Sequence, residues 1–222
     1  MEPVTLTTER LVLRPFAPSD AADVHAACQD PDIPRWTPVP SPYSLQEAEH
    51  FAGTRTPEGW RQDTEYSFAV CSRQDGFLIG TMGLMRLARL RTPERQAELG
   101  YWTAKERRGQ GYTVEAARAV ARWAFQDLGV ERLEWLAEAG NEASRAVARK
   151  VGFRMEGTLR AKLVHAGTRR DLWIGSLLPS DLPDPTEPSG TAGATGAPDV
   201  PGVPSVPGGT GSEATPYLPY TH

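Results

Sequence analysis

The chain has 222 residues, of which 39% are apolar and 23% charged, so it is long enough for one ordinary globular domain and too short for several. No apolar run approaches the roughly 20 residues that span a bilayer, and the N-terminus lacks the layout of a signal peptide, so we expect a cytoplasmic protein with no membrane role. Of its 28 acidic residues, four lie in the last forty, so 24 acidic residues face 24 basic ones before them, a balance that argues against a DNA-binding protein.

Residues 183–222 have the composition of a tail. They contain nine Pro and seven Gly but no Lys or Arg. Such a segment cannot bury enough apolar surface to offset its chain entropy. We therefore expect one folded domain over residues 1–182 and a disordered, Pro/Gly-rich acidic tail over residues 183–222.

The first elements of the domain are a short strand at residues 11–13, which Pro15 stops, and a helix that ends near Gln29. Five prolines between residues 31 and 42 then mark an irregular segment that carries Trp36 and Tyr43. These two rings either wall a substrate groove or pin the segment to the core.

A capping-box pattern opens the next helix. Ser44 and Glu47 stand three residues apart, and the helix should run to about Phe51. Three strands follow, at residues 66–72, 77–87 and 96–103, and Gln74-Asp75-Gly76 between the first two is a hairpin turn signal. These strands should form an antiparallel meander.

After these strands, the spacing of the apolar residues becomes that of a helix. Apolar residues recur at helical spacing from Val114 to Leu128, and Gly129 is well placed to end that helix. The remaining elements are a strand at 132–138, a helix at 141–151 that Gly152 ends, and strands at 153–159 and 169–178. A strand-helix-strand succession of this kind places ligands at helix N-termini.

The cysteines and histidines predict no metal site. Cys28 and Cys71 are too isolated for a zinc site or a disulfide framework, and the four histidines lack metal-ligand spacing. We expect both cysteines to be reduced.

The segment Arg107-Arg108-Gly109-Gln110-Gly111-Tyr112-Thr113 lies between a strand and a long helix. Gly109 and Gly111 can adopt dihedral angles closed to other residues, so successive N–H groups can converge on an anion at the positive end of the helix dipole. A pyrophosphate fits such a loop. The segment matches neither the P-loop nor the dinucleotide fingerprint, and taken alone the glycine pair also suits a tight turn.

The loop resembles the pyrophosphate motif of the GNAT superfamily of acyl-CoA-dependent N-acyltransferases. That motif is Arg or Gln, two residues, Gly, one residue, then Gly or Ala; Arg108, Gly111 and Thr113 occupy its positions, and Thr113 departs from the last.

Further segments resemble the RimJ/RimL branch, which includes acetyltransferases of ribosomal-protein N-termini. They are Thr8 to Pro15, Ala97 to Trp102, Asn141 with Ser144, Lys150 to Phe153, Arg170-Asp171, and Trp173 to Leu178. In order, they span roughly residues 5 to 182.

This resemblance implies an α+β, three-layer fold. Its central sheet is mixed and mostly antiparallel, with a splay between two parallel strands and about four flanking helices. The co-substrate would be acetyl-CoA or another acyl-CoA, with no metal. Trp102 and Thr103 would offer backbone groups to the pantetheine arm, residues 108–113 (Arg108, Gly109, Gln110, Gly111, Tyr112 and Thr113) would hold the pyrophosphate, and Asn141 would bind the pantetheine, cap its helix, or do both.

The resemblance also suggests two catalytic residues. Glu98 matches a strand position that serves as base in several superfamily members; the alternative is a carboxylate in a surface ion pair. Ser144 matches the position proposed to protonate the leaving thiolate; the alternative is an ordinary residue of a first helical turn.

The sequence does not identify the amine that accepts the acyl group. A ribosomal-protein N-terminus follows from the family name, while an aminosugar, polyamine, amino acid or antibiotic are alternatives. The resemblance implies that the loop from Pro31 to Tyr43, with Trp36 and Tyr43 as substrate-binding residues, the second helix and the final strand pair around His165 form its groove. A non-catalytic acyl-CoA sensor and a generic α/β domain with a glycine turn are the competing functions. Homodimers are common in the family, but the sequence identifies no seam for one.

Overall fold

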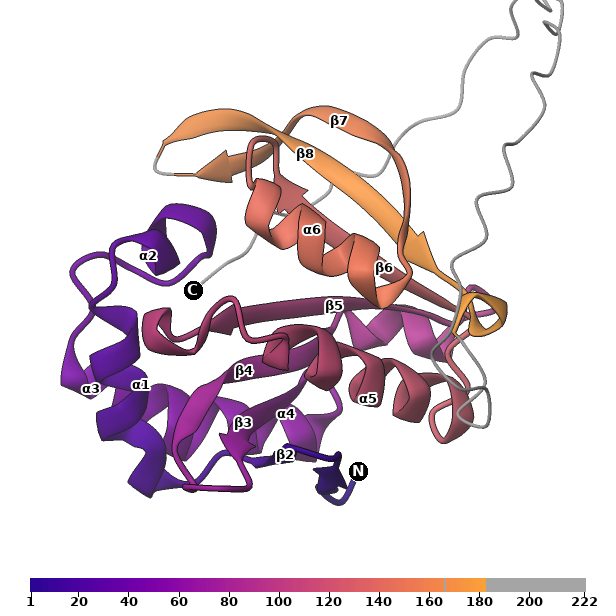
Figure 1. Ribbon diagram of the computed structural model, residues 1–222. Helices are drawn as coiled ribbons and strands as arrows, with labels where there is room; N and C mark the ends of the chain where they lie inside the picture. Colours follow the sequence, from indigo (N-terminus) through magenta and orange to yellow (C-terminus); the bar gives the residue numbers. More distant parts are fainter. Residues whose placement is uncertain (166, 183–222) are drawn as a thin grey trace, which may run out of the picture. The chain divides into compact units, whose positions relative to one another are not determined.

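The computed structural model describes residues 1–165 and 167–182, which form one eight-stranded sheet packed with helices (Figure 1). Its strand order is β1-β2-β3-β4-β5-β6-β8-β7, and every neighbouring pair is antiparallel except β5 and β6. The strands are β1 Leu6–Thr7, β2 Leu11–Pro15, β3 Tyr66–Ser72, β4 Leu78–Met85, β5 Gln96–Thr103, β6 Arg132–Glu138, β7 Arg154–His165 and β8 Thr168–Leu177. The helices are α1 Ala21–Cys28, α2 Asp32–Trp36, α3 Leu45–His50, α4 Thr56–Gln62, α5 Tyr112–Gln126 and α6 Glu142–Val151. The expected α+β class is confirmed; the predicted tail over 183–222 lies outside the described residues.

The meander of β3, β4 and β5 is confirmed. Phe68 pairs with Met82 across β3 and β4, and Met82 pairs with Tyr101 across β4 and β5. Gly76 lies in the turn before β4 with φ +74°, a left-handed conformation that costs glycine little because it has no Cβ. The hairpin signal in the sequence therefore located a real turn.

The parallel pair β5 and β6 is joined over three residues only. Residues 96–98 pair with residues 132–134, and past Glu98 and Glu134 the two strands have no pairing in the described part of the chain. Figure 1 shows β7 and β8 curving above β5, with α6 over β6. A splay therefore opens toward the C-terminal ends of β5 and β6, as the resemblance implies.

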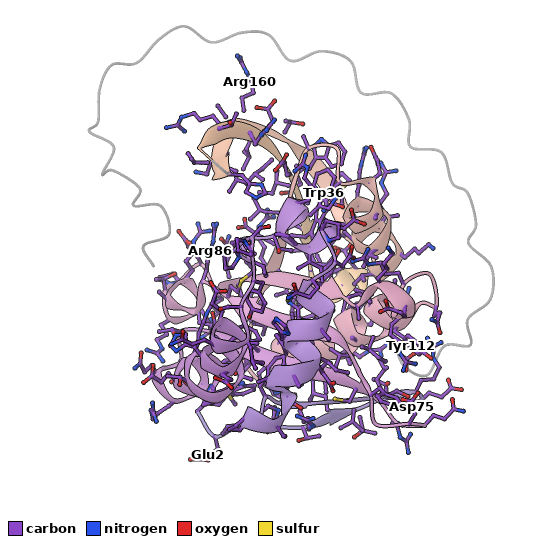
Figure 2. The ribbon with its side chains drawn as sticks, turned by 90° about the vertical axis from the view of Figure 1, so that its left-hand side faces the viewer. Glu2, Trp36, Asp75, Arg86, Tyr112 and Arg160 are labelled. Carbon is purple, nitrogen blue, oxygen red and sulfur yellow. The ribbon has the colours of Figure 1, made fainter. Side chains whose placement is uncertain are left out.

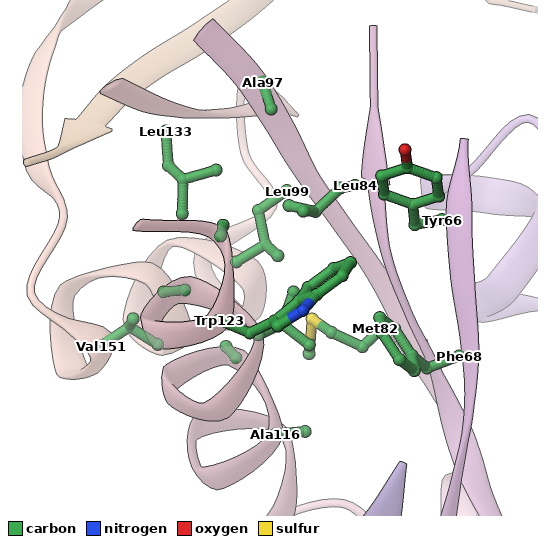
Figure 3. Packing of buried hydrophobic residues seen from close by; sticks show 14 of the residues in the cluster. Tyr66, Phe68, Met82, Leu84, Ala97, Leu99, Ala116, Trp123, Leu133 and Val151 are labelled. Carbon is green, nitrogen blue, oxygen red and sulfur yellow. The ribbon is translucent and has the colours of Figure 1, made fainter. Parts of the chain in front are cut away.

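The main core lies between the sheet and α5. The inward face of α5 is made of small residues, with Ala117, Val120 and Ala121 fully buried, so the helix can approach the strands closely. Figure 3 shows Trp123 of α5 lying among Phe68, Met82 and Leu99. Trp123 contacts the rings of Tyr66, Phe68 and Trp60, whose centroids lie 5.4–5.9 Å away.

A second core packs α1 and the α3 region against the sheet. It contains Val24 and Cys28 of α1, Ala48 of α3, and Trp102 of β5. Successive side chains of a strand point to opposite faces, so Leu99 enters the α5 core and Trp102 enters this one. Strand β5, which borders the splay, is thus covered by packed side chains on both faces.

The second predicted helix is longer and more broken than expected. The capping box forms, since Ser44 Oγ accepts a hydrogen bond from Glu47 N and Glu47 bonds back to Ser44 N. The chain then passes through a π-helical turn at Phe51–Arg55 into α4. The prediction missed α4 because Gly53 and Gly59 weaken the helical pattern, although Pro57 suits a first helical turn.

Two other segments also differ from expectation. The proline-rich stretch contains a short helix, α2, because its prolines stand near the start of the turn or outside it. Strand β7 continues to His165 instead of ending at Leu159, with irregular register between Met155 and Gly157 and between Leu159 and Leu163. Such bulges break the period-2 pattern that identifies a strand in a sequence.

None of the helices in residues 1–165 and 167–182 is long and apolar enough to cross a membrane.

Trp60→Ala should destabilise the domain by about 3–5 kcal/mol, because it removes a fully buried ring that also donates a hydrogen bond to Ser67 O. Urea unfolding measures the change. Phe77→Ala, at a side chain 58% exposed, is the matched control and should cost less than about 0.5 kcal/mol. Equal losses in the two variants would contradict the core described here.

Candidate active site

The loop between β5 and α5 presents a row of unpaired backbone N–H groups. Gly109 and Gly111 have φ +75° and +82°, and Gly111 is the residue before the first turn of α5. In the part of the chain that the structure describes, no backbone N–H from residue 109 to residue 114 donates a hydrogen bond to another residue. Six donors at the positive end of a 15-residue helix form an anion site of the kind that holds phosphate groups.

The side chain of Arg108 turns away from these N–H groups. Its guanidinium donates to Thr103 O at 3.0 Å and forms ion pairs with Asp30 at 2.5 Å and Asp32 at 3.1 Å. Two carboxylates therefore offset its charge, and an anion in the loop would rely mainly on the backbone. Arg108 also ties the loop to the segment that leads into α2.

The other side chains of the loop stabilise its ends. Thr113 Oγ1 lies 2.7 Å from Thr103 Oγ1, which joins α5 to β5. Gln110 Nε2 donates to Glu106 O at 3.0 Å, and the ring of Tyr112 lies under the guanidinium of Arg10. Thr113, where the motif has Gly or Ala, is thus accommodated by a hydrogen bond to the neighbouring strand.

The splay leaves one edge of β5 open beside this loop. From Leu99 to Thr103, β5 pairs with β4 on one side, while the described residues provide no strand partner on the other. Trp102 and Thr103 belong to this stretch, as the resemblance requires. An extended ligand can add to such an edge through main-chain hydrogen bonds.

Glu98 lies where the splay begins. Its side chain points away from α5, because its neighbours Ala97 and Leu99 both belong to the α5 core. Burial raises the pKa of its carboxyl group, while the charge of Arg86, whose Nε lies 2.8 Å from Oε2, opposes the rise. That contact lacks hydrogen-bond geometry, so the buried Oε2 has no hydrogen-bond donor among the described residues. The alternative expected from the sequence, a carboxylate in an ion pair, is met in part, since Glu98 pairs with Arg86, but this carboxylate is buried and not at the surface.

A second carboxylate faces Glu98. Glu134 occupies the position directly opposite on β6, and its charge further raises the pKa of Glu98. Arg89 and Arg132 lie 3.4 Å and 3.3 Å from the carboxylate of Glu134. Sequence reasoning missed Glu134, although the strand period of residues 132–138 places it on the same face as Glu138.

Ser144 lies in the first turn of α6, and its hydroxyl is fixed by two aromatic residues. Trp135 Nε1 donates to Ser144 Oγ at 3.0 Å, while the Tyr101 hydroxyl lies 3.0 Å from Ser144 O and 3.1 Å from Oγ. Tyr101 has one proton and a carbonyl oxygen only accepts, so when Tyr101 donates to Ser144 O the serine proton is left for Tyr101 or for a ligand. Burial raises the pKa of Tyr101 to about 12 and keeps the phenol neutral.

Tyr101 was not among the residues selected from the sequence. Its alternation with Leu99 on β5 would have placed it on the α5 and α6 face. Only the packing of α6 across the splay brings it to Ser144. Asn141 caps α6 through Oδ1, which accepts from Ser144 N at 3.1 Å, and this leaves its amide N–H₂ group for a ligand.

Trp36 and Tyr43 lie in different surroundings. Trp36 is the last residue of α2, and its ring lies under the Arg35 guanidinium at 4.0 Å, near Gly140. Tyr43 packs against the second core, as in the alternative that it pins the segment, and burial raises the pKa of its phenol. His165 reaches the same region as Trp36, since its Nε2 lies 3.2 Å from Pro34 O.

Comparison with protein families identifies one domain. Residues 10–154 match the model of the acetyltransferase (GNAT) domain. The matched range contains β2 to α6. It therefore includes the loop between β5 and α5, Glu98 and Ser144.

Individual relatives carry related names. The putative ribosomal N-acetyltransferase YdaF of Bacillus subtilis is 41% identical over 104 residues, which cover 47% of this chain and 55% of that protein, so the match spans about half of its length. The uncharacterised N-acetyltransferase YoaA of the same organism is 28% identical over 173 residues, 78% of this chain and 96% of that protein. A solved structure of a putative ribosomal-protein-serine acetyltransferase from Vibrio cholerae is 28% identical, with a TM-score of 0.70 over 81% of this chain and 100% of that one.

Glu98→Gln should stabilise the protein at pH 8 more than at pH 5. A carboxyl group whose pKa is raised by folding supports the folded state while it is protonated and opposes it once pH rises through the folded-state pKa. Urea unfolding of both proteins at the two pH values measures the difference. Glu131→Gln, at a side chain 68% exposed, should show no such pH dependence. A Glu98→Gln protein that loses stability at pH 8 relative to pH 5 would mean that Arg86 stabilises the ionised carboxylate by more than burial costs.

Proposed function

The chain belongs to the GNAT acetyltransferase family, and we propose that it transfers an acetyl group from acetyl-CoA to a primary amine at the N-terminus of a protein. The observation that carries this proposal is the row of six N–H groups, residues 109–114, that have no partner among the described residues and lie beside the edge of β5 that no described strand covers. A pyrophosphate and an extended amide-bearing arm are the two parts of CoA that such a surface fits.

The residues present suit acetyl-CoA. The N–H groups of residues 109–114 would hold the pyrophosphate, and the open edge of β5 at Trp102 and Thr103 would pair with the pantetheine amides. The amide N–H₂ of Asn141, which donates to no other described residue, would bind the same arm at the start of α6. Acetyl-CoA supplies an acetyl group activated as a thioester.

Glu98 would remove the proton from the acceptor amine, directly or through an ordered water. Among the described residues its Oε2 has an ion-pair contact with Arg86 but accepts no hydrogen bond, and its pKa is raised; a base of higher pKa takes up an ammonium proton more readily. Its position at the last residue pair of β5 and β6 supports this role, since the acceptor amine would have to reach the point where the two strands separate.

Ser144 would donate a proton to the departing sulfur. The donor from Trp135 and the neutral Tyr101 phenol orient Ser144 Oγ, and Tyr101 can replenish the serine proton. Tyr101 acts here as a positioning residue. A backbone N–H at the open edge of β5 would serve as the oxyanion donor.

A protein N-terminus is favoured as the acceptor by the named relatives. Both the YdaF protein and the Vibrio cholerae structure carry ribosomal-protein acetyltransferase names. We place the reaction in the cytoplasm, where two reduced cysteines such as Cys28 and Cys71 are usual.

Gly109→Ala should weaken acetyl-CoA binding at least about tenfold, because a Cβ at φ +75° distorts the loop that aligns the N–H groups. Calorimetric titration with acetyl-CoA measures the affinity. Gly76→Ala is a closely matched control, since Gly76 has φ +74° and, like Gly109, has no atom within 4 Å of an added Cβ. Both variants should lose similar stability, and only the loop variant should lose affinity. Equal affinity in both would remove the loop from the binding site.

Glu98→Gln should lower kcat about 100-fold or more at neutral pH and remove the acidic limb of the pH–rate profile, while the KM for acetyl-CoA stays within about twofold. Thiol release with an N-terminal peptide measures both constants. Ser144→Ala should lower kcat about tenfold or more without removing that limb. Retention of the acidic limb in Glu98→Gln would assign the base to another group.

A further inference from the structure

A buried carboxylate at the open end of the splay gathers three basic side chains. Glu138, the last residue of β6, is 6% exposed. Its Oε1 lies 3.0 Å from Arg35 Nη1 of α2 and 3.9 Å from Arg170 Nε of β8, and its Oε2 lies 2.9 Å from His165 Nδ1 of β7. We call Glu138, Arg35, His165 and Arg170 the mouth cluster.

The mouth cluster carries more positive than negative charge. Burial would raise the pKa of Glu138, but its hydrogen bonds with His165 and Arg35 outweigh this and hold the pKa below the ordinary value, so the carboxylate is ionised. One negative charge thus faces two guanidinium groups. Both partners of His165, the Glu138 carboxylate and Pro34 O, are acceptors, so the imidazole makes both bonds only when it is protonated.

The two arginines remain accessible beside their buried partner, and the position of Arg35 is also restricted. The side chains of Arg35 and Arg170 are each 47% exposed, although the carboxylate between them is buried. Arg35 also lies over the Trp36 ring at 4.0 Å, which restricts its rotamers. A guanidinium held like that of Arg35 meets a carboxylate with little loss of side-chain entropy, and Arg170 adds a second positive charge beside it.

Further positively charged side chains surround the mouth cluster and strengthen its attraction for an anion. Of the neighbouring acidic side chains, Asp32 is paired with Arg108, while Asp171 accepts a hydrogen bond from Ala161 N and keeps its charge. The outer part of the β7–β8 hairpin adds Arg160, Lys162 and Arg169. Figure 2 shows Arg160 projecting above Trp36 on this side of the molecule.

The mouth cluster lies on the proposed acceptor side of the splay. Strand geometry sets its distance from Glu98, the proposed base. Glu134 and Glu138 point away from the α5 core because Leu133, Trp135 and Ala137 point into it. Glu98 shares this face and pairs in register with Glu134. Four residues of strand separate Glu134 from Glu138, about 13 Å at roughly 3.3 Å per residue.

From this geometry we propose that Arg35 and Arg170 form an anion subsite that recognises an acidic side chain at the third to fifth residue of an extended N-terminal peptide acceptor. An extended peptide rises roughly 3.3–3.6 Å per residue, so an N-terminal amine at Glu98 places those residues at the mouth cluster. The inference rests on the proposed acetyl transfer to protein N-termini and names the class of peptide.

The test compares kcat/KM of the full chain for hexapeptides of Ala, Ser and Gly that carry one Glu at each position from two to six, each beside its Gln counterpart. We expect the Glu peptide to exceed its Gln counterpart about tenfold at positions three to five, and the ratio to fall as salt is raised. This arm uses the unaltered protein and does not depend on the folding of any variant.

The second arm uses Arg35→Gln combined with Arg170→Gln. The Glu/Gln ratio should fall to within about twofold, while kcat/KM for the Gln peptides and the KM for acetyl-CoA are retained. Arg61→Gln, which removes an exposed arginine on α4, is the matched control and should keep the ratio. Thermal unfolding monitors the double variant, and Arg35→Lys with Arg170→Lys should restore part of the preference if the fold is intact.

The outcomes separate this inference from the proposed function. Acetylation of the Gln peptides with a Glu/Gln ratio near one at every position would overturn the anion subsite and leave the proposed function standing. A preference for Glu that survives in the double glutamine variant would also overturn it. Transfer to none of the peptides, with acetyl-CoA binding intact, would overturn the protein N-terminus as acceptor and the subsite with it.

Discussion

The short parallel contact between β5 and β6 is the constraint on which the rest of the structure depends. Three residue pairs join the strands, and their divergence beyond Glu98 and Glu134 leaves an edge in the middle of the sheet that no described residue pairs with. Unpaired backbone groups inside a protein are costly, so such an edge persists where a ligand can supply the missing bonds. The α5 core and the second core hold β5 from both faces and keep the splay open without a strand to fill it.

The splay separates two chemical environments. On the α5 and α6 face lie Tyr101, Trp135 and Ser144, joined by hydrogen bonds among neutral groups. On the opposite face lie Glu98, Glu134 and Glu138, carboxylates of low exposure that face arginines of other elements. Neutral hydroxyl and indole groups thus lie on one side of the gap and carboxylates paired with arginines on the other, and the proposed acid, Ser144, and the proposed base, Glu98, belong to different sides.

Much of the local structure was predictable from the sequence because its signals are local. The capping box at Ser44 and Glu47, the turn at Gly76 and the stop of α6 at Gly152 each depend on neighbouring residues and each formed. The prediction missed α2 and α4 and shortened β7, where proline, glycine and bulges interrupt the periodic patterns. Tertiary packing stabilises these segments in spite of weak local preference.

The sequence by itself determined the glycine turn at residues 109–111, since Gly109 and Gly111 stand immediately before a long amphipathic helix and adopt positive φ angles there. It also placed Glu98 and Ser144 on the correct elements. Only the tertiary structure decided which side chains meet them: Arg86 and Glu134 at Glu98, Tyr101 and Trp135 at Ser144, and the three basic groups at Glu138. The physical reason is that backbone conformation follows from adjacent residues, whereas the pKa and partners of a buried side chain depend on strands and helices brought together from distant parts of the chain.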